Sequence, residues 1–74
     1  MPRYFFHVLN GVKTQDLNGT DLPNLAAARG EAQKDIEDIK LAHFSSLGRN
    51  WSGWSIEICD RDGGLLLVIP FSSN

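Results

Sequence analysis

The chain contains few of the residues that usually bind metals or carry redox chemistry. Its 74 residues include one cysteine and, besides scattered carboxylates, two histidines. A single cysteine cannot close an internal disulfide, and a structural metal centre needs three or four ligands at compatible spacing. We therefore expect no disulfide, no metal site and no cofactor.

Positive charge is also scarce. Seven Lys and Arg residues stand against nine Asp and Glu residues, which gives a formal net charge of -2. Nucleic acids and anionic membranes attract strongly basic surfaces. This charge balance disfavours both as partners.

Long apolar segments are missing as well. The longest apolar run, Leu65–Phe71, is far shorter than the ~20 residues that cross a bilayer. The first residues show no charged stretch followed by an apolar stretch of signal-peptide length. We expect a cytoplasmic protein that makes no membrane contact.

The short length leaves room for one core, so residues 1–74 are predicted to form a single domain. A domain of this size buries only about 60% of the surface that its unfolded chain exposes. Self-association is a common source of the missing stability in such small proteins.

The first part of the chain predicts a β-hairpin. Residues 3–9 are rich in aromatic and β-branched residues and stop at Asn10–Gly11, a strong turn signal, so a second strand is expected over residues 12–17. A two-residue loop at this turn pairs Leu9 with Val12, His7 with Thr14 and Phe5 with Asp16.

An amphipathic helix is predicted over residues 25–45, because apolar residues recur there at helical spacing on one stripe. Asn24 is placed to cap its first turn. The helix should end between residues 44 and 47, with Gly48 in a left-handed cap.

A second hairpin is predicted from residues 54–60 and 65–71, joined at Asp62–Gly63. A two-residue loop there places three apolar pairs on one face, and this face is the predicted wall of the core. The pairs are Trp54 with Phe71, Ile56 with Ile69, and Ile58 with Leu67.

These elements predict an α+β fold of order ββαββ, with a four-stranded, mainly antiparallel sheet and the amphipathic helix packed on one face. Two strand orders stay open. In one, the first and last strands are parallel neighbours at the centre of the sheet; in the other, all strands are antiparallel and the last lies at an edge. The apolar run 65–69 suits a central strand, whereas Pro70 prefers an edge.

The sheet face opposite the helix is the predicted interaction surface. If Tyr4, Phe6 and Val8 face the helix, the alternate side chains point away from it, and one helix cannot cover both faces. An exposed apolar face is usually buried against another copy or another protein, so we expect a homodimer. Alternatively, its apolar residues are merely scattered on the surface. The candidate residues are Arg3, Phe5, His7, Leu9, Asp16, Leu66 and Val68.

The opening residues, Pro2–His7, resemble those of a family of short bacterial proteins that is common in rhizobia and their relatives. The similarity continues through Gly11, Asp16, Gly19, Leu22–Leu25, Asp60, Gly64 and Pro70–Phe71. The family is domain-of-unknown-function family 6894, so the resemblance implies a single-domain architecture but no activity and no functional residues. The chain departs from the common pattern at Asp21 and Asn24, and both changes are chemically small.

Three residues suggest chemistry, and each also has a structural interpretation. His7 lies diagonally from Asp16, so a carboxylate could orient its imidazole, but no nucleophile is fixed beside it and a hydrogen-bonding cluster fits as well. Pro2, if it becomes the first residue, would resemble the N-terminal proline of small tautomerases. Cys59 lies on an apolar strand near Glu57, which raises the pKa of the thiol and favours an inert side chain.

We therefore interpret the chain as a small non-enzymatic domain that self-associates or binds another protein, with no assigned catalytic residue. A small nucleic-acid-binding or regulatory protein is the alternative, because Phe5 and Arg3 on an open sheet face could stack on bases and neutralise phosphate. A tautomerase-like enzyme that uses Pro2 is a remote alternative.

Overall fold

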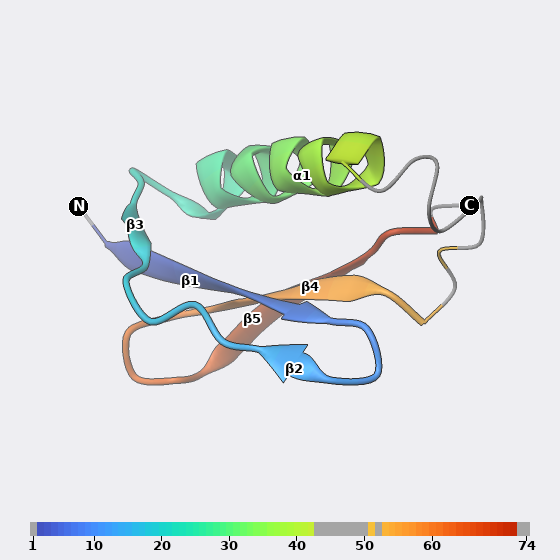
Figure 1. Ribbon diagram of the computed structural model, residues 1–74. Coiled ribbons are helices and arrows are strands. Elements are labelled where there is room, and N and C mark those ends of the chain that lie inside the picture. The colour runs from blue at the N-terminus through green and yellow to red at the C-terminus, as the bar shows by residue number, and fades with distance from the viewer. Residues whose placement is uncertain (1, 43–50, 52, 73–74) are drawn as a thin grey trace.

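The computed structural model describes residues 2–42, 51 and 53–72, and in it one helix lies over one face of an antiparallel sheet (Figure 1). The elements are β1 (Arg3–Leu9), β2 (Lys13–Thr14), β3 (Thr20–Asp21), α1 (Leu25–Ala42), β4 (Ser55–Cys59) and β5 (Leu65–Pro70). The predicted α+β class is confirmed. None of the helical residues described here form a segment long and apolar enough to span a membrane.

The sheet has the order β2-β1-β4-β5, and β3 pairs with β1 beside β2 along the same edge. Every pairing is antiparallel, so the second of the two predicted strand orders is the one observed. Pro70 ends the edge strand β5, where its missing N–H leaves no gap in the ladder. The strand expected over residues 12–17 is shorter in the structure, where β2 comprises Lys13–Thr14, and the short strand β3 at Thr20–Asp21 was not predicted.

The predicted register of the first hairpin is wrong by one residue. Leu9 pairs with Lys13 and Val8 pairs with Thr14, so the loop comprises residues 10–12. The Asn10 side chain accepts the N–H of Val12 at 3.4 Å, and Gly11 has a φ of 96°. Because a shift of one residue exchanges the two faces of a strand, neither Thr14 nor Asp16 stands opposite its predicted partner.

The predicted register of the second hairpin is confirmed along most of its length, from Ser55 paired with Pro70 to Ile58 paired with Leu67. The ladder then shifts, because Cys59 pairs with Leu65 and leaves Leu66 as the extra residue of a β-bulge. The turn is therefore longer than the expected Asp62–Gly63 loop.

The Asp60 side chain shapes this longer turn. Its carboxylate accepts the N–H of Asp62 at 3.0 Å and that of Gly64 at 2.7 Å. An aspartate that binds backbone N–H groups ahead of it closes a tight loop without a two-residue turn. These hydrogen bonds account for the shift in register beyond Ile58.

The core lies between α1 and the sheet, as predicted. Ala28 and Ala32 are fully buried, so the helix backbone approaches the sheet closely at this end. The Asn24 side chain accepts the N–H of Ala27 at 2.9 Å, which confirms the predicted cap. The predicted helix end and its Gly48 cap lie outside the described residues. The buried cluster is Tyr4, Phe6, Ala28, Ala32, Ile36, Ile56, Ile58 and Phe71.

Candidate functional site

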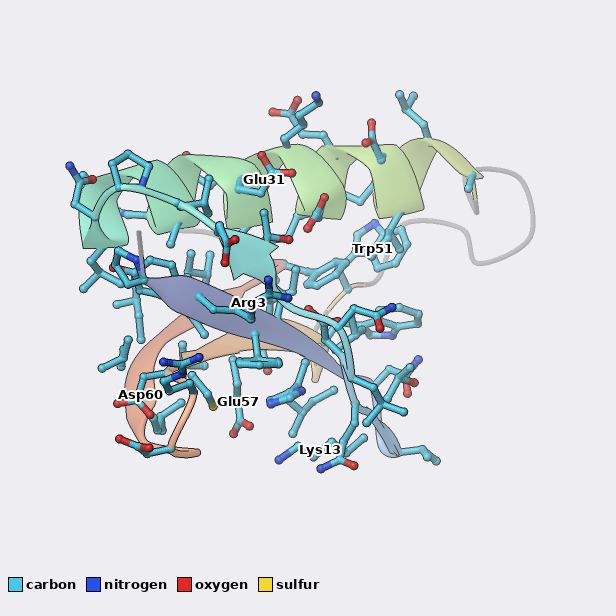
Figure 2. All side chains as sticks on the ribbon, turned by 90° about the vertical axis from the view of Figure 1, so that its left-hand side faces the viewer. Arg3, Lys13, Glu31, Trp51, Glu57 and Asp60 are labelled. Carbon is cyan, nitrogen blue, oxygen red and sulfur yellow. The ribbon has the colours of Figure 1, made fainter. Side chains whose placement is uncertain are left out.

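The sheet face that points away from α1, here called the outer face, carries most of the predicted interaction residues. Phe5, His7 and Leu9 of β1 stand opposite Cys59, Glu57 and Ser55 of β4, and the alternate residues of both strands belong to the core. Figure 2 shows Lys13, Glu57 and Asp60 on this side of the sheet. No element among the described residues covers the outer face (Figure 1).

The apolar side chains of the outer face are exposed on β5 and half-buried on β1. Leu66 is 40% exposed and Val68 is 46% exposed, whereas Phe5 and Leu9 are half-buried. The same face has a shallow hollow of about 170 Å³. Its lining residues are Phe5, His7, Cys59, Asp60, Arg61 and Gly63. The outer face is therefore an apolar ridge next to a shallow depression.

One ion pair crosses the outer face. The Lys13 Nζ lies 3.4 Å from the Glu57 Oε1, and the two side chains come from β2 and β4. Because the charges compensate each other, this part of the surface repels neither an acidic nor a basic partner. A second copy of the same face meets no uncompensated charge here.

His7 and Asp16 are neighbours, but their side chains do not form the predicted pair. The His7 Nδ1 accepts the backbone N–H of Asp16 at 3.0 Å, which places the proton of the neutral ring on Nε2. His7 is buried. The structure therefore gives this histidine a structural hydrogen bond in place of a carboxylate that orients it.

The Asp16 carboxylate binds the backbone on both sides of it. It accepts N–H groups from Phe6 at 3.2 Å and from Asn18 and Gly19, each at 3.1 Å. Burial raises the pKa of Asp16, but these three backbone hydrogen bonds outweigh it and, with the nearby His7, hold the pKa below its ordinary value. Asp16 connects β1 to the segment between β2 and β3.

Arg3 is occupied within the fold. Its Nε lies 3.1 Å from the Asp21 Oδ1, its Nη2 donates to the Oδ2 of the same residue, and its Nη1 donates to the Asn18 carbonyl at 2.6 Å. The Arg3 stem also packs on Gly19. The guanidinium is thus neutralised and held, so no observation favours the predicted role in nucleic-acid binding.

Cys59 is buried, and its thiol stays protonated at neutral pH. Burial raises its pKa, Glu57 and Asp60 raise it further, and Lys13 offsets part of the effect. The expected direction of this shift is confirmed. A thiol in this state is a poor nucleophile.

A groove that the sequence did not indicate lies between α1 and β5. It has a volume of about 320 Å³, and its lining residues are Gln33, Ile36, Glu37, Lys40, Ile69, Pro70 and Phe71. Among the strands, α1 contacts mainly β4, and the inner side of β5 is left partly open. The sequence does not indicate how many strands of the sheet the helix covers.

One end of the groove is held rigidly. The Lys40 Nζ donates to the Phe71 carbonyl at 2.7 Å and lies 6.0 Å from the centre of the Trp51 ring. Trp51 stacks on Phe71 at 5.6 Å and meets Trp54 edge-on at 5.0 Å. These contacts fix the position of Lys40 as a wall of the groove (Trp51 is labelled in Figure 2).

Comparison with known proteins identifies a family and no activity. Neither the curated proteins nor the solved structures include a match to this chain. A family model, described as "Domain of unknown function (DUF6894)", matches residues 3–72 and so extends over every strand and the helix. The chain belongs to this family of domains of unknown function.

Proposed function

We propose that this domain is a non-enzymatic, cytoplasmic interaction module that forms a homodimer through its outer face. The observation that carries the proposal is the exposure of Leu66 and Val68, two adjacent aliphatic side chains on a face that no described element covers. Large exposed apolar groups that lie together on a small domain mark interaction surfaces. Burial of the ridge would add the stability that a chain of this length lacks.

The form of the outer face supports a second copy as the partner. The ridge of Leu66 and Val68 stands beside the hollow lined by Phe5 and Cys59, so two copies related by a two-fold axis can place ridge against hollow. The Lys13–Glu57 pair adds no net charge to this contact. Two identical faces would therefore meet without electrostatic repulsion.

Sedimentation equilibrium over a range of concentrations tests the proposal. The wild-type chain is expected to shift from monomer to dimer as its concentration rises to high micromolar values. The double variant Leu66→Lys with Val68→Lys should weaken the dimer by at least about tenfold, because each chain brings two unpaired charges into the contact.

A matched control adds the same charge elsewhere. Leu41, on the helix, is 75% exposed and Val12, in the first loop, is 72% exposed, so Leu41→Lys with Val12→Lys leaves the outer-face ridge intact. This control should dimerise like the wild type. A wild-type chain that stays monomeric at millimolar concentration would rule out the proposed self-association.

A further inference from the structure

The outer edge of β5, which pairs with no other described strand, has an unusual pattern of backbone donors and acceptors. Phe71 donates its N–H to the Trp54 carbonyl at 2.9 Å, and the two residues follow the same register as β4 and β5. In an antiparallel ladder, hydrogen-bonded and non-bonded pairs alternate. Ile69 and Leu67 therefore direct their backbone groups toward β4, and Val68 and Pro70 direct theirs away from the sheet.

This edge has more acceptors than donors. Val68 and Pro70 each present a carbonyl outward, but proline has no N–H, so Val68 supplies the one outward donor of residues 67–70. The bulge at Leu66 interrupts the alternation at the other end. A partner that pairs with this edge must bring N–H donors.

The same pattern disfavours a second copy at the edge. If two β5 strands paired about Val68, they would form two hydrogen bonds, because Pro70 has no donor and the bulge lies opposite it. An ordinary extended peptide forms three: it donates to the carbonyls of Val68 and Pro70 and accepts the N–H of Val68. The edge therefore forms more hydrogen bonds with a strand from another protein than with the β5 strand of a second copy.

The groove between α1 and β5 lies beside this edge. Ile69 and Pro70 of β5 contribute to its lining, together with Ile36 and Phe71 from the core. In an added strand, the residue paired with Val68 points to the outer face, and its two neighbours point to the helix side. The neighbour that stands opposite Ile69 would enter the groove, whereas the neighbour opposite Leu67 lies outside its lining.

We infer that β5 and this groove bind an extended peptide segment of a partner protein by antiparallel strand addition. The segment has an apolar side chain opposite Ile69, next to the residue that pairs with Val68, and this side chain packs on Ile69 and Pro70. Main-chain hydrogen bonds provide affinity in such complexes, and pockets for alternate side chains provide specificity. The inference uses the backbone edge of β5 and the helix side of the sheet, whereas the proposed dimer uses side chains of the outer face, so the inference goes beyond the proposed self-association although Val68 belongs to both.

Backbone hydrogen exchange of Val68, followed by NMR, tests the inference. The probes are capped pentapeptides of alternating Thr and apolar residues, in which the two apolar positions are Val, Leu, Ile or Phe in turn. At least one should slow the exchange of the Val68 N–H in a saturable way. Methylation of the central backbone nitrogen should weaken that peptide by about tenfold, because it removes the donor to the Val68 carbonyl.

Two tryptophan substitutions on the exposed side of α1 separate the groove from its surroundings. Glu37→Trp fills the groove and should abolish peptide protection of Val68, whereas Asp38→Trp, one residue further on, should leave it unchanged. Equal binding to both variants would overturn the groove as the site. Val68→Pro offers a second check, because it removes the outward donor without touching the β4 ladder, and Val68→Thr is its control.

Two results would contradict the inference and leave the outer-face dimer intact. In the first, none of the peptides protects Val68 at millimolar concentration. In the second, the N-methylated peptide binds as well as its parent. Loss of dimerisation in sedimentation, with peptide protection retained, would reject the outer-face proposal alone.

Discussion

His7 and Asp16 are joined through the ring of one and the main chain of the other: the Nδ1 of His7 accepts the N–H of Asp16 at 3.0 Å. The carboxylate of Asp16 is used elsewhere, on three backbone N–H groups. The two residues therefore form successive links of one chain of hydrogen bonds. This chain fixes the segment that follows β2 against β1.

His7→Ala should lower the free energy of unfolding by about 1–3 kcal/mol, because it leaves the Asp16 N–H without its acceptor in a partly buried site. His7→Asn should recover much of this loss, since its amide oxygen can take the place of Nδ1. Urea denaturation of both variants measures the difference. Equal losses in the two variants would show that the ring contributes through its packing.

Asp16→Asn should cost about 1–3 kcal/mol at neutral pH, because the charged acceptor of three backbone N–H groups becomes a neutral one. The pKa of Asp16 in the folded chain lies below its ordinary value, so the native state binds this proton less tightly than the unfolded chain. The stabilisation is full above the unfolded carboxyl pKa of about 3.9 and is lost as pH falls through the folded pKa.

Chemical denaturation at several pH values checks this expectation. The difference in unfolding free energy between wild type and Asp16→Asn should shrink as the pH falls below about 4. A difference that stays constant into the acid range would mean that the carboxylate charge of Asp16 contributes nothing.

Gly19→Ala should destabilise the domain by about 2–4 kcal/mol, which combines backbone strain with overpacking. Gly19 has a φ of +74°, and a Cβ there would lie 2.8 Å from the Arg3 Cγ and 2.9 Å from the Phe5 Cε2. Gly11 is a matched control, because its φ is +96° but nothing lies within 4 Å. Gly11→Ala should cost only about 1–2 kcal/mol, and thermal unfolding measures both.

Asp35→Asn should raise the free energy of unfolding at neutral pH by about 0.5 kcal/mol. Burial raises the pKa of Asp35, Glu31 and Asp38 raise it further, and Lys34 offsets part of this effect. Because the folded pKa lies above the unfolded one, the charge of Asp35 costs stability at neutral pH. This cost begins to shrink as the pH falls to the folded pKa and is gone below the unfolded pKa.

The control for Asp35 is Asp62→Asn, which changes the net charge equally in the exposed second turn. It should give no gain in stability at neutral pH. If both variants gained equally, the effect would come from the net charge of the chain and not from the surroundings of Asp35.

The register of the second hairpin could be predicted because its β4 strand has apolar residues on one face and polar residues on the other. Ile56 and Ile58 alternate with polar neighbours, and a shift of one residue would expose them, so only one register buries the apolar set. The bulge was not predictable from this pattern. The bulge depends on the hydrogen bonds that the Asp60 carboxylate accepts, and the spacing of apolar residues does not reveal these bonds.

The first hairpin lacked such a pattern. Residues 13–16 are polar on both faces, so burial does not select a register, and Asn10–Gly11 indicates a turn without setting the length of its loop. The predicted partners of His7 were wrong for this reason. Asp16 was correctly placed near His7, but its carboxylate binds backbone groups that a side-chain pattern does not reveal.

The donor-poor edge of β5 limits how far the sheet can grow. At the other edge of the sheet, β2 is only two residues long and β3 also has two residues, so neither offers a long template for pairing. Pro70 and the bulge at Leu66 limit the edge formed by β5. Neither edge of the described sheet therefore offers a second copy a long, uninterrupted template, so the domain is expected to stay out of fibrils even with aliphatic side chains exposed on its surface.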